Sequence, residues 1–161
     1  MAHAARAIDD AELSETRVIH REFWAALNPV LDLMGGPVSG ARKPQPQSWM
    51  AYSIGRGGFN LGAAMNRQKQ HVRAELYISG DLAKTFFGLL KNQKAEIEGA
   101  LGYPLEWEEL PDARDCRIAC YLHDVDPADK AEWPKQHEWL AKRLNEMHRV
   151  FAPRVRALEA G

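Results

Sequence analysis

The stretch from Phe59 to Ile78, FNLGAAMNRQKQHVRAELYI, decides the fold. Apolar residues recur at every second position on both sides of the polar segment 67–70, and this period is typical of strands with one buried face. A third run of the same kind, 48–54, precedes it across a glycine-rich turn at 55–58. We therefore expect three antiparallel strands, over 48–54, 59–66 and 71–78, joined by tight turns.

Outward from this meander the apolar period lengthens to three or four residues, which predicts helices over 12–34, over 81–101 and from Pro134 onward. Asp81 is expected to cap the middle helix. Two more strands are expected over 105–110 and 116–122. The order α-βββ-α-ββ-α predicts an α+β fold, with a mainly antiparallel sheet of roughly four to five strands packed by helices on one face.

Length and composition favour a single globular domain over 1–161, with a flexible tail at 1–11 and a proline-containing loop at 37–47. A net charge of −1 excludes a protein that coats nucleic acid by bulk positive charge. The chain has neither an apolar run of about 18 residues nor the apolar core of a signal peptide, so we expect no membrane contact and a cytoplasmic location. Cys116 and Cys120 lie too far apart on one strand to form a disulfide.

Several segments together resemble the uncharacterised prokaryotic family known as domain of unknown function 4268. The most specific of them is Ile97-Glu98 followed by Leu101-Gly102, Leu105 and Trp107. The resemblance extends over roughly residues 17–159. It implies a domain that occurs alone or C-terminal to predicted restriction-type nuclease domains, and it implies no catalytic residues. The remaining segments that carry it are Phe23-Trp24, RAELYI at 73–78, FGLLKNQKAEIEGALGYPLEW at 87–107, Trp139-Leu140 and FAPR at 151–154.

The predicted element order is also similar to the core of PD-(D/E)xK nucleases, in which carboxylates on two neighbouring strands hold Mg²⁺ and a lysine assists. Here the third strand offers Glu75, but Tyr77 stands where the lysine is expected. The second strand offers Asn60 in place of an acid. Glu98 on the following helix is a further candidate acid. Glu75 and Glu98 are therefore weak catalytic candidates, and Mg²⁺ is expected only if this alternative holds. Otherwise we expect no metal and no cofactor.

A basic strip runs along the turns and the polar face of the meander. Such side chains can contact phosphates, and a tyrosine on the same face can stack on a base. An ordinary solvated hairpin would show the same pattern. The candidate nucleic-acid-binding residues are Arg56, Arg67, Lys69, His71, Arg73 and Tyr77.

These observations favour a non-catalytic binding or assembly module of a nuclease-associated or defence system. The expected partners are DNA or RNA, and a protein partner or a second copy of the chain. Two alternatives stay open: a divergent nuclease that uses Glu75, and a homo-oligomerisation domain.

Overall fold

The computed structural model describes the backbone of residues 2–159 and the side chains of residues 15–159. It confirms the α+β class, with one five-stranded sheet in the order β1-β2-β3-β5-β4. Every neighbouring pair of strands is antiparallel. The elements are α1 (Ala2–Met34), β1 (Trp49–Ser53), β2 (Phe59–Asn66), β3 (His71–Ile78), α2 (Ala83–Lys91), α3 (Lys94–Leu101), β4 (Glu106–Glu108), β5 (Cys116–His123), η1 (Lys130–Glu132) and α4 (Trp133–Ala157).

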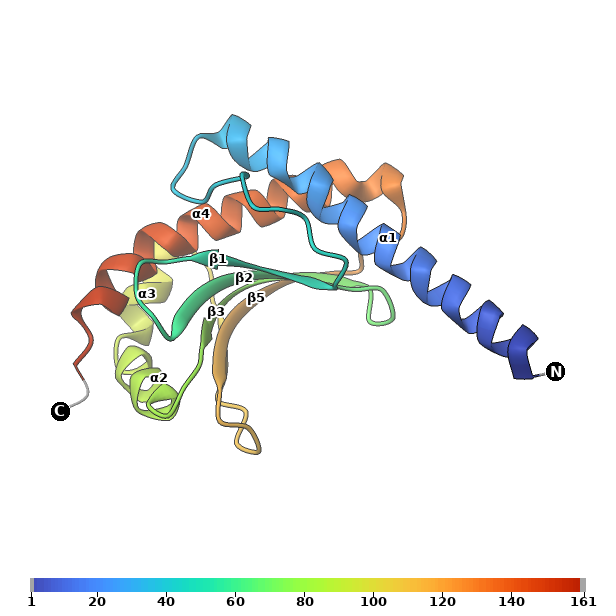
Figure 1. Cartoon of the computed structure of the whole chain (residues 1–161). Helices are drawn as coiled ribbons and strands as arrows, with labels where there is room; N and C mark the ends of the chain where they lie inside the picture. The colour runs from blue at the N-terminus through green and yellow to red at the C-terminus, as the bar shows by residue number, and fades with distance from the viewer. Residues whose placement is uncertain (1, 160–161) are drawn as a thin grey trace.

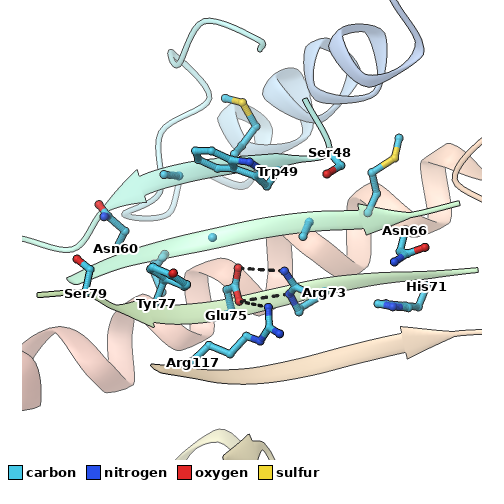
Figure 2. A pocket seen from close by; sticks show the side chains of 16 residues that line it. Ser48, Trp49, Asn60, Asn66, His71, Arg73, Glu75, Tyr77, Ser79 and Arg117 are labelled. Carbon is cyan, nitrogen blue, oxygen red and sulfur yellow. Dashed lines mark hydrogen bonds and ion pairs between the residues drawn. The ribbon is translucent and has the colours of Figure 1, made fainter. Parts of the chain in front are cut away.

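The sheet is strongly curved, and its helices lie on the convex side (Figure 1). Helix α4 runs along this side in contact with β2 and β3, and α1 packs on the outside of α4. The concave face carries no helix in the part of the chain that the structure describes, and Figure 2 looks onto that face. One face of the sheet is therefore packed and the other is open.

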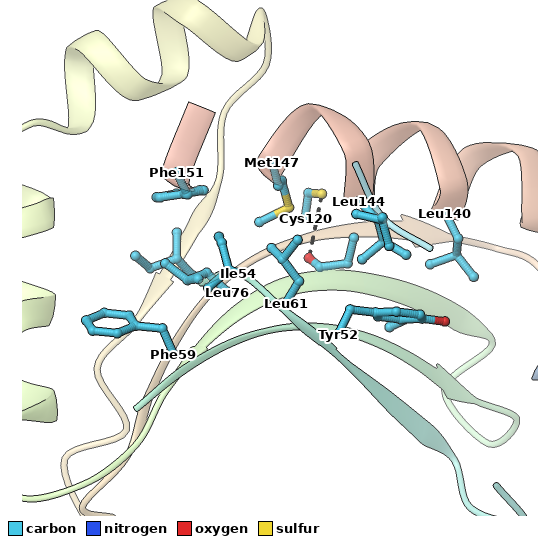
Figure 3. Packing of buried hydrophobic residues seen from close by; sticks show 14 of the residues in the cluster. Tyr52, Ile54, Phe59, Leu61, Leu76, Cys120, Leu140, Leu144, Met147 and Phe151 are labelled. Carbon is cyan, nitrogen blue, oxygen red and sulfur yellow. Dashed lines mark hydrogen bonds between the residues drawn. The ribbon is translucent and has the colours of Figure 1, made fainter. Parts of the chain in front are cut away.

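The convex face is apolar because β1, β2, β3 and β5 each place every second residue there. Leu61 and Leu76 from the strands meet Leu144, Met147 and Phe151 of α4 (Figure 3). All five side chains are fully buried. Burial of one such side chain stabilises the fold by about 1.5–3 kcal/mol, so the seam between α4 and the sheet dominates the core.

Cys116 and Cys120 belong to the same packed face, and both are free and buried. Burial raises the pKa of the Cys120 thiol to about 12, so this sulfur stays protonated at neutral pH. Burial also raises the pKa of Cys116. Both cysteines act as small apolar residues of the core.

Four expectations about the helices and strands were wrong. Helix α1 begins at Ala2 instead of Glu12. The expected helix over 81–101 is two helices, because the Gln93 N–H bonds the Leu90 carbonyl three residues back and tightens the turn there. This break lets α2 pack on β3 and β5 while α3 packs on α4. Asp81 caps neither helix. The fourth strand is shorter than expected, Glu106–Glu108.

No helix within the described residues is both long and apolar enough to cross a membrane.

Candidate functional site

The open face of the sheet presents its side chains in rows that run across the strands. Because the strands are in antiparallel register, each row contains one residue from each of β1, β2, β3 and β5. The first row is Trp49, Ala64, Arg73 and Tyr121, the second is Ala51, Gly62, Glu75 and Ala119, and the third is Ser53, Asn60, Tyr77 and Arg117.

A hollow of about 630 Å³ lies over the middle of this face. Its floor consists of the small residues Ala51, Gly62 and Ala64 on β1 and β2. The half-exposed indole of Trp49 stands on the β1 side, and the longer side chains of β3 stand opposite (Figure 2). Small residues between tall ones therefore make a slot that a flat ligand can enter. We call this hollow the slot.

Glu75 is the central charged residue of the slot, and it is 6% exposed. Its Oε2 atom lies 3.2 Å from Nε of Arg73 and 3.9 Å from Nη1 of Arg117. Both are ion-pair distances, yet Oε2 accepts no hydrogen bond of good geometry from the described residues. The other oxygen, Oε1, has one long hydrogen bond of 3.5 Å from Nη2 of Arg73. The carboxylate is thus neutralised by its neighbours but has unused acceptor capacity.

The two arginines are also incompletely bonded. The Nε atoms of Arg73 and Arg117 are buried and have no hydrogen-bond partner of good geometry among the described residues. Arg117 Nε lies 3.4 Å from Oε1 of Glu108, whose other oxygen accepts a 2.5 Å hydrogen bond from the Tyr121 hydroxyl. Burial, together with this bond to Glu108, raises the pKa of Tyr121 to about 12. A chain of alternating charges therefore crosses β3, β5 and β4.

At one end of the slot Tyr77 donates a 2.8 Å hydrogen bond to Asp115. This bond lowers the pKa of Asp115, and the Gly80 N–H and Arg114 lower it further against the opposing effect of burial. The Asp115 carboxylate is accordingly ionised at neutral pH, and it is paired with Arg114 at 3.4 Å.

The opposite end of the slot is formed by His71, which is 7% exposed and packs beside the rings of Tyr121 and His123. Burial lowers the pKa of His71, and the neighbouring His123, Arg73 and Lys69 lower it further. Its Nδ1 atom is buried and has no hydrogen-bond partner among the described residues. The imidazole is therefore neutral at pH 7, with one unused polar atom.

A second hollow of about 480 Å³ continues from this end and shares Ser48, Met65 and Asn66 with the slot. It runs between α1 and the β2–β3 turn and includes Arg67. Lys69 lies exposed on the same turn. Within residues 15–159, neither Arg67 nor Lys69 forms an ion pair. The groove therefore ends in two cations that no carboxylate among residues 15–159 neutralises.

The structure brings together five of the six residues expected to bind nucleic acid: Arg67, Lys69, His71, Arg73 and Tyr77 all lie along this face or its turn. Arg56 lies elsewhere. Its Nη1 atom donates to the carbonyls of Val155 and Leu158 at the end of α4, at 2.8 and 2.7 Å.

The two weak catalytic candidates do not meet. Glu75 is on the open face, whereas Glu98 on α3 accepts hydrogen bonds from the Leu105 N–H and from Nε1 of Trp107, at 2.8 and 3.1 Å. Trp107 packs against Phe87 on the convex side. Within the described part of the chain, no group of three or more His, Cys, Asp and Glu side chains is arranged to hold a metal ion.

Sequence reasoning missed Trp49, Gly62, Arg117, Glu108 and Tyr121 as parts of this site. The alternation of β5 shows that Arg117 and Tyr121 share the polar face of their strand. What it does not show is that β5 pairs with β3, which places them beside Glu75 and Arg73.

A family model described as "Domain of unknown function (DUF4268)" matches residues 19–155. The chain belongs to this family. The matched region of this DUF4268 domain contains the whole slot and the β2–β3 turn. Neither the curated proteins nor the solved structures include a match to the chain.

Proposed function

We propose that this DUF4268 domain is a non-catalytic binding module whose open sheet face takes single-stranded nucleic acid. The observation that carries the proposal is the composition of the groove. Trp49, Tyr77 and two arginines surround a floor of glycine and alanine, and at its end stand Arg67 and Lys69, which form no ion pair within residues 15–159. Aromatic side chains on an uncovered surface stack on unpaired bases, and arginines and lysines contact the backbone.

The charges divide the groove into two parts. Arg73 and Arg117 are neutralised by Glu75 and Glu108, so the slot suits an uncharged polar group such as a base. Arg67 and Lys69 carry no such partner within residues 15–159, so the turn suits phosphate. The proposal therefore assigns base contact to the slot and backbone contact to the turn.

The surroundings of Glu75 favour binding over cleavage. A magnesium-dependent nuclease needs carboxylates that converge on the metal. Glu75 is instead flanked by two guanidinium groups, and Glu98 lies on the other side of the sheet. The proposal expects no cleavage of DNA or RNA with Mg²⁺ or Mn²⁺. Cleavage that is lost in Glu75→Ala would contradict it and favour the nuclease alternative.

The proposal is tested by fluorescence anisotropy with a labelled thymine octamer between about 50 and 200 mM salt. We expect binding at low salt that weakens as salt rises, because neutralised phosphates release counterions. Arg67→Ala and Lys69→Ala should each lower the slope of log affinity against log salt by about 0.7. Lys135→Ala and Arg149→Ala, at exposed positions of α4, are the matched controls. Failure of every oligonucleotide to bind at low salt would refute the proposal.

Trp49→Ala supplies an independent test of the base contact. A base stacked on an aromatic side chain contributes about 1–3 kcal/mol, so affinity should fall by about tenfold or more while the salt slope stays unchanged. A fall in the salt slope instead would place the phosphates, and not a base, at Trp49.

The restriction-type nuclease neighbours that the family resemblance implies suit this proposal, because a DNA-contacting module can hold a neighbouring nuclease on its substrate. Copurification of the chain with such a nuclease would test that association. The homo-oligomerisation alternative predicts a dimer or larger assembly by light scattering at high protein concentration.

A further inference from the structure

The unused hydrogen-bonding groups of the slot have a definite pattern. One carboxylate, Glu75, supplies acceptors, and the guanidinium groups beside it, Arg73 and Arg117, supply donors. All three side chains are largely buried and joined by ion-pair contacts, yet each has a polar atom that lacks a hydrogen bond of good geometry among the described residues. Buried polar groups normally have partners, so such a set points to a ligand with the complementary pattern.

The carboxylate is also placed to face the ligand. Glu75 leans across β2 above Gly62, so close that a Cβ atom at position 62 would lie 3.0 Å from its Oε1 and Cγ atoms. Gly62 is part of the slot floor, which extends toward Trp49. A flat ring lying on this floor, against the indole, would present its edge to the carboxylate (Figure 2).

The charges exclude an anion at this position. Glu75 would repel a phosphate or a carboxylate group, and together with Glu108 it already compensates the two nearby arginines. The ring is therefore neutral, and the edge that meets Glu75 carries donors.

Among the bases, only guanine has two adjacent donors on one edge, N1–H and the N2 amino group, which a carboxylate accepts together. Guanine also carries acceptors at O6 and N7, the groups that arginine recognises. Adenine and cytosine each present one donor group beside an acceptor, and thymine presents one N–H between two carbonyls. Resting on the function proposed above, we infer that the slot binds one guanine base, with Glu75 on its N1 and N2 donors and an arginine donating to O6.

The direction of the strand follows from the second hollow. The groove leads from Glu75 past His71 to the β2–β3 turn, and Arg67 and Lys69 stand there. Four strand residues, about 13 Å, separate Glu75 from His71, which leaves room for the sugar between base and phosphate. The backbone of the bound guanine nucleotide therefore exits toward Arg67.

The test uses the full chain and thymine octamers that carry one central guanine, inosine, adenine or cytosine, measured by competition at low salt. We expect the guanine oligonucleotide to bind about tenfold to a hundredfold more tightly than plain thymine octamer. Inosine lacks the N2 amino group and should lose about tenfold of this gain. Glu75→Gln should bring the guanine oligonucleotide down to the inosine level, whereas Glu96→Gln, at an exposed position of α3, should change nothing.

The outcomes separate the inference from the proposed function. Equal affinity for all central bases, or a preference for adenine or cytosine, overturns the guanine assignment and leaves nucleic-acid binding standing. Equal affinity for guanine and inosine overturns the contact with N2. No binding by any octamer overturns both. The comparison of guanine with inosine needs no variant, so it decides the inference even if Glu75→Gln does not fold.

Discussion

The side chain of Glu75 lies directly over Gly62 of the neighbouring strand, with its Oε1 and Cγ atoms 3.0 Å from the place where a Cβ would be. These two residues face each other in the register of β2 and β3. The missing side chain at position 62 is what lets a carboxylate lie low in the slot, within 3.2 Å of Nε of Arg73. Glycine is therefore used here for close approach, and it is placed in a strand interior where it costs conformational entropy.

Gly62→Ala should leave stability nearly unchanged and weaken oligonucleotide binding. Alanine in a strand interior makes folding more favourable than glycine by about 0.5–1 kcal/mol. This gain offsets the free-energy cost of displacing the flexible Glu75 carboxylate. The same displacement raises the slot floor and moves the acceptor. Urea unfolding should give a change within about 1 kcal/mol, and anisotropy should show weaker binding. Gly57→Ala is the matched control, since nothing lies within 4 Å of a Cβ there. Unchanged affinity in Gly62→Ala would argue against the slot as the binding site.

Arg56→Ala should reduce stability without reducing nucleic-acid affinity. Its guanidinium donates to two carbonyls at the end of α4 and lies 4.9 Å from the ring centre of Phe86. Loss of these charged hydrogen bonds should cost about 1–3 kcal/mol in urea unfolding. Arg67→Ala should do the reverse, with a stability change within about 0.5 kcal/mol and weaker binding. If Arg56→Ala is fully folded and still binds oligonucleotide more weakly, Arg56 contributes to the nucleic-acid-binding surface after all.

The partners of Arg56 could not be predicted from the sequence. The glycine-rich turn that contains it could be predicted from local signals, and a turn arginine is normally solvated. Its actual partners, Val155 and Leu158, lie about a hundred residues away in the chain and are brought near only by the packing of α4 on the sheet. A contact of this kind has no local signature.

The strands of the meander could be predicted because alternation within each strand and short turns between strands are both local. The pairing of β3 with β5 could not, since α2, α3 and β4 lie between them in the chain. That single pairing brings Arg117 to Glu75 and places Tyr121 beside Arg73. Half of the site was therefore visible in the sequence as a polar face on β3, and the other half depended on topology.

Glu98→Ala should destabilise the fold and leave binding unchanged. The substitution would leave two donors, the Leu105 N–H and Nε1 of Trp107, without their acceptor, at a cost of about 2 kcal/mol. Burial opposes ionisation of this carboxyl, but these two bonds and Lys94 hold its pKa below the usual value.

Because the folded-state pKa of Glu98 is depressed, its contribution is present above the unfolded-state pKa and is lost as pH falls through the lower folded-state pKa. The gap in urea midpoint between wild type and Glu98→Ala should therefore be wide at pH 7 and narrow in strong acid. Glu96→Ala, at an exposed position of the same helix, should show neither effect. A difference in urea midpoint that stays constant with pH would show that the protonated Glu98 carboxyl stabilises the fold as much as the ionised one.

His137 should make the protein less stable in mild acid. The side chain is 2% exposed and packs against the rings of Phe23 and Trp133, and its Nε2 atom has no hydrogen-bond partner among the described residues. Burial lowers its pKa from 6.5 to about 4, against a smaller opposing effect of the Phe23 backbone. The unfolded chain therefore binds a proton near pH 5 that the folded chain does not, so stability falls as pH drops from about 7 toward 4. The loss by pH 5 should be about 2 kcal/mol from this residue.

Urea unfolding of wild type and His137→Gln at pH 7.5 and pH 5 measures this loss. The variant should lose less stability between the two conditions, whatever its absolute stability. Lys135→Gln, at an exposed position of α4, should keep the wild-type difference. Burial also lowers the pKa of His20, His71 and His148, and the residual pH dependence of His137→Gln reports their share. Equal losses in wild type and His137→Gln would show that the buried imidazole is not the group that responds.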